Sequence, residues 1–211
     1  MIYLIITTSI QNRILSSLNQ EERKQQYLSS ISHTLSILPK EIQPIIVENN
    51  GKRDTFLDHF KHYNQSVPVI YTDNNQYQFK NKGINELLDV KEVIEKIKIK
   101  DNDIVIKLTG RYLLTSPLFL NEIIEKETKY DAFIKFYGSC SLKYEIYDCI
   151  LGLYGIRAVY LKLLSHYWMN LYESPEIAFA KYIRSTISRI YESQQLDLQC
   201  IFSDNGRILY V

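Results

Sequence analysis

The chain has 211 residues, of which 45% are hydrophobic and 23% charged, a composition typical of a folded globular domain. Its 25 basic and 24 acidic side chains leave a formal charge of +1, which excludes a large basic field for holding nucleic acid or an anionic membrane. No apolar stretch approaches the ~20 residues of a membrane span, and the first residues lack the basic start of a signal peptide. We therefore expect a soluble, cytoplasmic protein with no nucleic-acid partner and no membrane span.

The first half of the chain predicts strands that alternate with helices. Runs of β-branched and aromatic residues predict strands over 2–8, 44–48, 68–71 and 103–108. Helical spacing of apolar residues predicts a helix that begins after Asn19 and ends before Pro39, a short helix over 55–61, an amphipathic helix over 81–97 and a helix over 116–124. This alternation favours a mostly parallel sheet with helices on both faces.

The second half of the chain changes character. Apolar runs predict strands over 132–137 and 149–154, which we expect to pair as a mixed extension of the sheet. A helix is predicted over 157–164, another begins at Ser174-Pro175-Glu176 and runs to about Ile190, and short strands over 199–202 and 208–211 follow. Since the sequence contains no internal repeat or Gly/Pro-rich linker, we expect a single α/β domain.

The cysteines and histidines predict neither disulfides nor a metal centre. Cys140, Cys149 and Cys200 form no Cys-x-x-Cys pair, and we expect all three to be reduced packing residues. His59 and His62 are three residues apart on a predicted helix, but no cysteine or carboxylate cluster nearby completes a ligand set. We expect these two histidines on a solvated helical face.

Polar residues follow the predicted parallel strands. The four loops begin with Thr7-Thr8-Ser9, Glu48-Asn49-Asn50-Gly51, Asp73-Asn74-Asn75 and Thr109-Gly110-Arg111-Tyr112. In such sheets ligands bind at the carboxyl ends of the strands, so these loops predict a binding site. For Asn49-Asn50-Gly51 ordinary turn formation explains the residues equally well.

The segment Lys107 to Tyr112 indicates an anion site. It combines a lysine within an apolar strand, a glycine that allows a close backbone approach, and an arginine that can fork onto phosphate oxygens. The alternative is a lysine on a half-exposed strand and an arginine paired with a surface carboxylate.

Several of these segments resemble the GT-A class of nucleotide-sugar glycosyltransferases, especially small capsule-type members and members encoded by large viruses. The similar segments are the first strand with its Thr-containing loop (2–9), the second strand with its acidic end and Gly turn (44–51), the Asn-x-Gly segment (81–85), the signature strand (103–108) and the acidic helix start (174–176). The resemblance implies a Rossmann-related GT-A fold over 1–211. Residues 1–115 would bind the nucleotide-sugar, and 116–211 would form the acceptor and catalytic half.

The chain departs from the family where the signature strand ends. GT-A enzymes usually have an Asp-x-Asp motif there that holds a divalent metal on the donor diphosphate, whereas this sequence has Thr109-Gly110-Arg111. Asp101-Asn102-Asp103 spells the motif at the other end of the strand, and we interpret it as a turn. We therefore expect no metal site, although Asp73 could supply one ligand to Mn²⁺ or Mg²⁺. Arg111, with Lys107 or Lys82, would neutralise the diphosphate instead.

The resemblance implies a hexosyltransferase-type reaction from a nucleoside-diphosphate sugar to a hydroxyl of a glycan or glycoprotein. Glu48 and the Thr7-Thr8 loop would bind the nucleoside, and Asn81 and Gly83 would border the donor. The other donor-binding candidates are Asn49, Lys107, Thr109 and Gly110. Glu176, or Glu173 as second choice, would deprotonate the acceptor hydroxyl if the anomeric centre is inverted. For Glu176 the alternative is a carboxylate that stabilises the first turn of a helix.

Two other functions remain open from the sequence. Nucleotidyl transfer uses similar α/β sheets, although it normally needs carboxylate-bound Mg²⁺ and a Gly-rich first loop, and Thr7-Thr8-Ser9-Ile10 is not Gly-rich. A degenerate domain that binds glycans or partner proteins would also suit the 17 tyrosines, which can stack on sugars or line an interface.

Overall fold

The computed structural model describes residues 1–10, 20–51, 55–77, 79, 81–136, 147–172, 174–201 and 207–211. A seven-stranded sheet lies at its centre, in the order β10-β8-β9-β6-β1-β2-β5. Strand β9 runs antiparallel to its neighbours β6 and β8, and the other pairs are parallel. The strands are β1 (Ile2–Thr8), β2 (Ile42–Glu48), β5 (Val69–Tyr71), β6 (Ile104–Thr109), β8 (Ala132–Ile134), β9 (Leu153–Arg157) and β10 (Ile190–Glu192).

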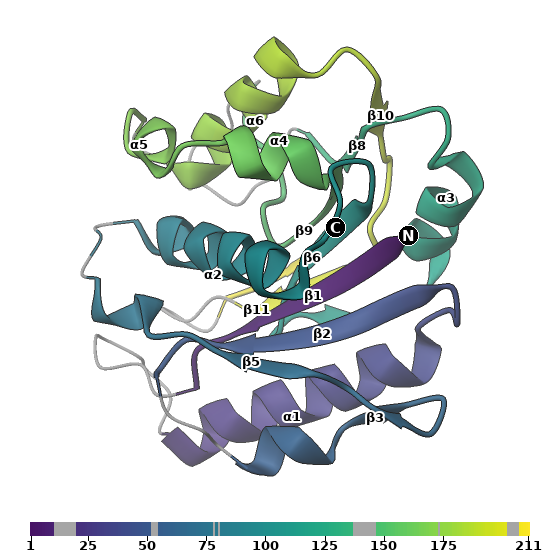
Figure 1. Ribbon diagram of the computed structural model, residues 1–211, viewed down its shortest axis with the longest axis vertical. Helices are drawn as coiled ribbons and strands as arrows, with labels where there is room; N and C mark the ends of the chain where they lie inside the picture. The colour runs from purple at the N-terminus through teal and green to yellow at the C-terminus, as the bar shows by residue number, and fades with distance from the viewer. Residues whose placement is uncertain are drawn as a thin grey trace.

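Helices cover both faces of this sheet (Figure 1). One face carries α1 (Gln20–Ile37) and α3 (Leu118–Lys126), and the other carries α2 (Lys82–Ile97), α4 (Ala158–Leu163), α5 (His166–Met169) and α6 (Pro175–Thr186). Alternate residues of β1 enter the two cores, Leu4 on the α1 side and Ile5 on the α2 side, because successive side chains of a strand point to opposite faces. The predicted mixed α/β sheet and single domain are confirmed.

Local sequence explains the main helices. In α1 the stripe of Tyr27, Ile31 and Leu35 is buried against the sheet. Asn81 caps the start of α2, since its side chain accepts a hydrogen bond from the N–H of Gly83 at 3.0 Å, and Lys98 caps its end in the left-handed conformation with φ 59°. Among the described residues, we find no helix with the length and apolar character needed to cross a bilayer.

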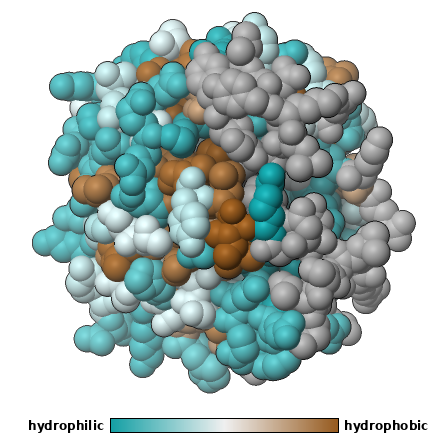
Figure 2. Space-filling model, turned by 180° about the vertical axis from the view of Figure 1, so that it is seen from behind, coloured by the Kyte–Doolittle hydropathy of each residue, from teal (hydrophilic) through white to brown (hydrophobic). Residues whose placement is uncertain are grey.

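Smaller elements complete the molecule. A second sheet contains β7 (Leu113–Leu114), β11 (Leu198–Ile201) and β12 (Ile208–Tyr210), and a hairpin contains β3 (Lys61–His62) and β4 (Gln65–Ser66). The 3-10 helices are η1 (Thr55–His59) and η2 (Asn74–Gln76). From behind, an apolar area lies near the centre of the surface, with hydrophilic residues on several sides of it (Figure 2).

Four expectations about elements are wrong. The strand predicted over 149–154 is β9, which begins four residues later, at Leu153. The helix predicted to reach Ile190 ends at Thr186, and Ile190 is the first residue of β10. His59 ends η1 whereas His62 lies in β3, so the two histidines do not share a helix. The helix predicted to reach Lys61 also stops at His59. Cys149 and Cys200 are buried as expected, while Cys140 lies outside the described residues.

Candidate active site

The predicted carboxyl ends of the strands meet at one edge of the sheet. Strand β1 lies between β2 and β6, with Thr8 opposite Glu48 and Thr7 opposite Thr109. All three strands run in the same direction, so the loops that follow them start side by side. The expected placement of these strand ends at one edge is thereby confirmed, whereas a shared cleft and the ligand contacts of these residues remain predictions.

Glu48 anchors the loop that follows β1. Its side chain is fully buried, and its carboxylate accepts hydrogen bonds from the hydroxyl of Thr8 at 2.6 Å and from the N–H of Ile10 at 3.3 Å. The amide of Asn50 donates to the same carboxylate. The hydroxyl of Thr7 points inward and donates to the carbonyl of Leu108 at 3.4 Å. In this structure Glu48 shapes the loop predicted to hold the nucleoside, and direct contact with a nucleoside remains a prediction.

Two residues of α1 hold the same loop from the other side. Arg23 Nε donates to the carbonyl of Ser9 at 2.8 Å, and the N–H of Ser9 donates to the hydroxyl of Tyr27 at 3.1 Å. Arg23 Nη2 also donates to the Tyr27 hydroxyl at 3.3 Å. The sequence analysis did not identify Arg23, although an arginine one helical turn before the buried Tyr27 was a usable signal. The loop after β1 is thus fixed from both β2 and α1.

Arg111 lies in the turn after β6, as expected, but it is buried. It is 7% exposed and its Nη1 donates to the carbonyl of Ile201 at 3.0 Å. Its own carbonyl accepts a hydrogen bond from the Ser30 hydroxyl at 3.2 Å. Among the described residues Arg111 forms no ion pair with a carboxylate. These residues therefore do not support the alternative in which Arg111 pairs with a surface carboxylate.

Lys107 points to the opposite face of the sheet and is 2% exposed, which excludes the half-exposed strand position considered as an alternative. Its ammonium group donates to Thr109 Oγ1 at 2.6 Å, to the carbonyl of Leu151 at 3.1 Å and to the carboxylate of Glu86. An ammonium group has three protons, so these acceptors use all of its donors. A contact between Lys107 and a phosphate remains a prediction that requires this arrangement to open.

Packing and capping account for three of the predicted donor-binding residues, Gly83, Gly110 and Asn81. A Cβ at Gly110 would lie 2.9 Å from the carbonyl oxygen of Thr7, and a Cβ at Gly83 would lie 2.8 Å from Cβ of Pro175. Gly110 therefore allows β6 to approach β1, and Gly83 allows α2 to approach α6. Asn81 caps α2 and its amide lies 3.5 Å from the carbonyl of Met169. Their predicted contacts with a donor are untested.

Asp89 joins the ends of β2 and β5 and was missed by the sequence analysis. It is fully buried on α2 and accepts hydrogen bonds from Thr72 Oγ1 at 2.7 Å, Asn74 Nδ2 at 2.8 Å and Asn49 Nδ2 at 3.0 Å. Burial raises the pKa of Asp89 to about 7, although the three hydrogen bonds oppose this shift. Asn49 therefore holds α2, and its Oδ1 is buried with no hydrogen-bond partner among the described residues.

Glu176 lies at the start of α6, next to the start of α2. Its N–H donates to Ser174 Oγ at 3.2 Å, and the Ser174 hydroxyl also contacts the Glu176 carboxylate. Burial raises the pKa of Glu176; the hydrogen bond from Ser174 lowers it, and the negative charges of Asp148 and Glu86 raise it further. A carboxylate with a raised pKa suits proton abstraction, but the first-turn stabilising role also fits. Glu173 lies outside the described residues.

The described residues do not fit the divalent metal that GT-A enzymes usually hold. No group of three histidine, cysteine or acidic side chains among them could surround an ion, and Asp73 is exposed. Asp101 and Asp103 lie at the amino end of β6, away from the candidate site, as expected. Asp103 accepts a hydrogen bond from the N-terminal ammonium at 2.9 Å, and Asp101 pairs with Lys162 at 2.5 Å.

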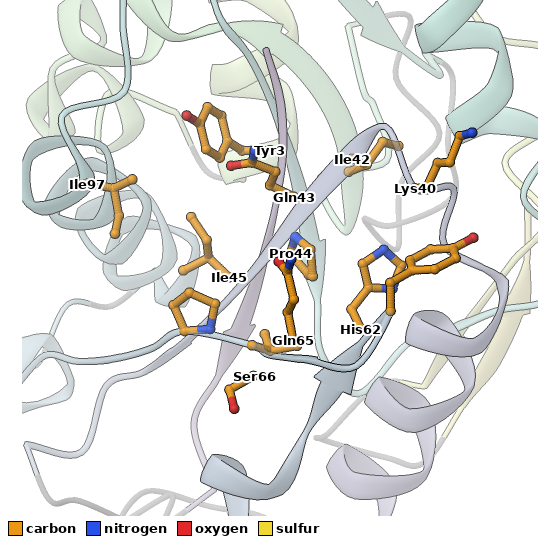
Figure 3. Close-up of a pocket in the computed structure, with 13 residues that line it drawn as sticks. Tyr3, Lys40, Ile42, Gln43, Pro44, Ile45, His62, Gln65, Ser66 and Ile97 are labelled. Carbon is orange, nitrogen blue, oxygen red and sulfur yellow. The ribbon is translucent and has the colours of Figure 1, made fainter.

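A pocket of about 400 Å³ also lies away from the candidate site. It follows the amino-terminal half of β2, where Gln43, Pro44 and Ile45 face Ile97 at the end of α2 and His62 of the hairpin (Figure 3). The candidate site is at the opposite, carboxyl end of β2, so this pocket is not part of it.

Comparison with known proteins supports the fold. No protein-family model and no curated protein sequence matches the chain. Among solved structures, a nucleotide-diphospho-sugar transferase from Desulfovibrio desulfuricans G20 superposes with a TM-score of 0.57 at 11% identity, covering 90% of this chain and 78% of that one. The galactosyltransferase LgtC, in complex with donor and acceptor sugar analogs, gives 0.53 at 9% identity and covers 91% and 73%.

A third similar structure has a different described activity. The 4-diphosphocytidyl-2C-methyl-D-erythritol synthase from Anaerococcus prevotii DSM 20548 superposes with a TM-score of 0.56 at 12% identity, covering 91% of this chain and 86% of that one. Identities this low establish the architecture and not the reaction. The chain therefore has a GT-A-like fold of the kind found in nucleotide-sugar transferases.

Proposed function

We propose that this protein is a glycosyltransferase that moves a sugar from a nucleoside-diphosphate sugar to a hydroxyl of a glycan or glycoprotein. The observation that carries the proposal is the placement of Arg111 and Glu48 at one edge of a GT-A-like sheet, with a carboxylate of raised pKa, Glu176, at the start of α6. Arg111 would supply positive charge for the diphosphate of the donor, and Glu176 would supply a base for the acceptor hydroxyl. Residues 1–115 would bind the donor and 116–211 would complete the acceptor side.

Glu176 acts as the base in this proposal if the reaction inverts the anomeric carbon, and the steps that follow are those of an inverting transfer. Glu176 takes the proton of the acceptor hydroxyl while the acceptor oxygen forms a bond to the anomeric carbon. The bond from that carbon to the diphosphate oxygen breaks, and its electron pair leaves with the diphosphate. Arg111 stabilises the negative charge that develops on this leaving group, which is a contact that strengthens in the transition state. Proton removal by a positioned carboxylate contributes roughly 10²–10⁴ in rate.

The donor would lie against the loop after β1 in this proposal. Glu48 accepts a hydrogen bond from the backbone N–H of Ile10 in that loop, and Thr7 and Thr8 tie the end of β1 to β6 and β2. Asn49 ties the next loop to α2 through Asp89. Since these side chains are already buried, we propose that the nucleoside is recognised through the loops they shape. Preorganised loops of this kind lower the ordering cost of binding.

A screen of nucleotide-sugars tests the proposal. The protein is incubated with UDP- and GDP-linked sugars, with and without oligosaccharide acceptors, and release of the nucleoside diphosphate and formation of a glycosidic product are measured. One donor should give product that depends on the acceptor. If no donor binds or turns over while glycans bind, the protein is a binding module and the proposal is wrong.

Nucleotidyl transfer is the second candidate, because the diphosphocytidyl-compound synthase superposes nearly as well as the sugar transferase from Desulfovibrio desulfuricans G20. The two reactions release different products: pyrophosphate leaves a nucleoside triphosphate in the one, and a nucleoside diphosphate leaves the sugar in the other. Pyrophosphate release from CTP or UTP in the presence of sugar phosphates or alcohol phosphates would favour nucleotidyl transfer.

A further inference from the structure

Two buried guanidinium groups lie on the α1 side of the candidate site. Arg23 projects from α1, and Arg111 follows β6. Ser30 lies two helical turns after Arg23, on the same face of α1, and donates a hydrogen bond to the carbonyl of Arg111 at 3.2 Å. The face of α1 that carries Arg23 therefore also contacts Arg111. Arg23 in turn holds the carbonyl of Ser9, next to the end of β1. Both groups therefore lie where the ends of β1 and β6 meet.

Each guanidinium has a buried donor for which the described residues supply no acceptor. Arg23 is 4% exposed, and its Nη1 has no hydrogen-bond partner in the part of the chain that the structure describes; Arg111 is 7% exposed, and the same holds for its Nε. Buried polar groups are nearly always paired in native proteins, because an unpaired one loses its hydration without compensation. Two orphaned donors on neighbouring cations are consistent with an acceptor that binds between the two side chains.

The local charge also favours an anion. Burial lowers the pKa of Arg23, and the positive charge of Arg111 lowers it further, whereas Tyr27, Glu48 and Glu86 raise it. Among the described residues, Arg23, Arg111 and Lys107 carry three positive charges here and Glu48 and Glu86 carry two negative charges, which leaves a net charge of +1. A bound anion would remove the repulsion between the two guanidinium groups.

We propose that Arg23 and Arg111 together form a site for a phosphoryl group, and that this group is the diphosphate of the donor. The second statement rests on the proposed glycosyltransferase function, whereas the first rests on the two guanidinium groups alone. Planar guanidinium groups match phosphate oxygens with paired hydrogen bonds, which an ammonium group cannot do. Arg23 thus becomes a second phosphate ligand, supplied by the first helix and added to the one that follows β6.

Calorimetric titration with inorganic pyrophosphate, UDP and uridine tests this site. The wild-type protein should bind pyrophosphate and UDP, and should bind uridine much more weakly. Arg23→Gln should weaken pyrophosphate binding by about 10- to 100-fold, the value of losing hydrogen bonds to a charged group. Lys24→Gln is the matched control, because it removes the same charge from the next residue of α1, a partly exposed side chain beside Phe56, and should leave pyrophosphate affinity within about 2-fold.

Each outcome bears on the site. If Arg23→Gln folds and binds pyrophosphate as the wild type does, or if the wild type does not bind pyrophosphate, the site is wrong. If Arg23→Gln does not fold, Arg23→Lys decides: unchanged affinity contradicts the proposal, and a loss of about 3-fold or more supports it. If the site binds pyrophosphate through Arg23 but no nucleotide-sugar is turned over, the proposed function fails while the phosphoryl site stands.

Discussion

Asn49 at the end of β2 and Asp89 in the middle of α2 are joined by a hydrogen bond of 3.0 Å between two fully enclosed side chains. Thr72 and Asn74 donate to the same carboxylate, so one side chain of α2 holds the ends of both β2 and β5. The loops predicted to bind the donor are therefore attached to a helix on the α2 side as well as to one another. A change in the protonation of Asp89 acts on all of these attachments.

The stability of the protein should fall as the pH rises toward 7 because of Asp89. Its pKa is about 7 in the folded protein, whereas an unfolded chain has an aspartate pKa near ~3.9. Between these values the folded state binds more protons, so the free energy of unfolding decreases with rising pH, by up to about 4 kcal/mol once Asp89 is ionised. Urea unfolding at pH 5 and pH 8 should show about 3 kcal/mol of this difference, since the remainder develops below pH 5. In Asp89→Asn the decrease in the free energy of unfolding between pH 5 and pH 8 should be smaller. An equal decrease in the variant and the wild type would show that Asp89 does not cause it.

Glu176→Gln should lower kcat by roughly 10²–10⁴ and leave the KM for the donor nearly unchanged, since the glutamine cannot accept the acceptor proton. In the wild type the acid limb of the kcat profile should lie above the usual glutamate range, because the pKa of Glu176 is raised by burial and by the charges of Asp148 and Glu86. Activity requires the ionised form, so kcat should rise with pH through this value.

Glu86→Gln provides the matching test for that profile. Removing the Glu86 charge takes away one of the effects that raise the pKa of Glu176, so the acid limb should move to lower pH. The amide oxygen of glutamine can still accept a hydrogen bond from Lys107, while the loss of the carboxylate charge should lower the stability of the protein. An acid limb that stays in place in Glu86→Gln, or a Glu176→Gln variant with normal kcat, would show that Glu176 is not the base.

The fold was predictable where local sequence and tertiary structure agree. Every residue of β1 is buried, as its nearly continuous run of β-branched and aromatic residues predicts. The start of α2 combines the Asn81 cap with a regular apolar stripe. By contrast, the apolar run before β9 is continuous from Cys149 onward, so periodicity could not show that pairing with β6 begins only at Leu153.

The candidate site was predictable only in part. Strand ends are local features, so the loops after Thr8, Glu48 and Thr109 were correctly placed at one edge. Arg23 and Asp89 belong to helices that pack back onto that edge, and only the three-dimensional structure brings them to the loops. Burial was also invisible to the sequence, because a lysine such as Lys107 is rarely enclosed unless it is paired.

Gly110→Ala should destabilise the protein by about 1–3 kcal/mol, because the new Cβ would lie 2.9 Å from the backbone oxygen of Thr7 in the neighbouring strand. Gly83→Ala is the comparison. At Gly83 the new Cβ would meet the ring of Pro175. Because alanine has a helix propensity about 1 kcal/mol more favourable than that of glycine, the loss of stability in Gly83→Ala should be smaller. Thermal unfolding of both variants checks the order; a Gly83→Ala variant that is less stable than Gly110→Ala would contradict it.

The final prediction concerns metal dependence and follows from Thr109-Gly110-Arg111 at the end of β6. The diphosphate develops negative charge as the sugar bond breaks, and a cation must already be in position. Since the described residues include no set of carboxylates that fits a metal, we expect activity to persist in EDTA. Arg111→Ala should weaken donor binding and slow transfer by about 10²-fold or more, and Arg111→Lys should recover only part, because a point charge cannot make the planar contact. Normal kinetics of Arg111→Ala, or activity that EDTA abolishes and Mn²⁺ restores, would instead indicate a metal held by acidic residues, with Asp73 the first to test.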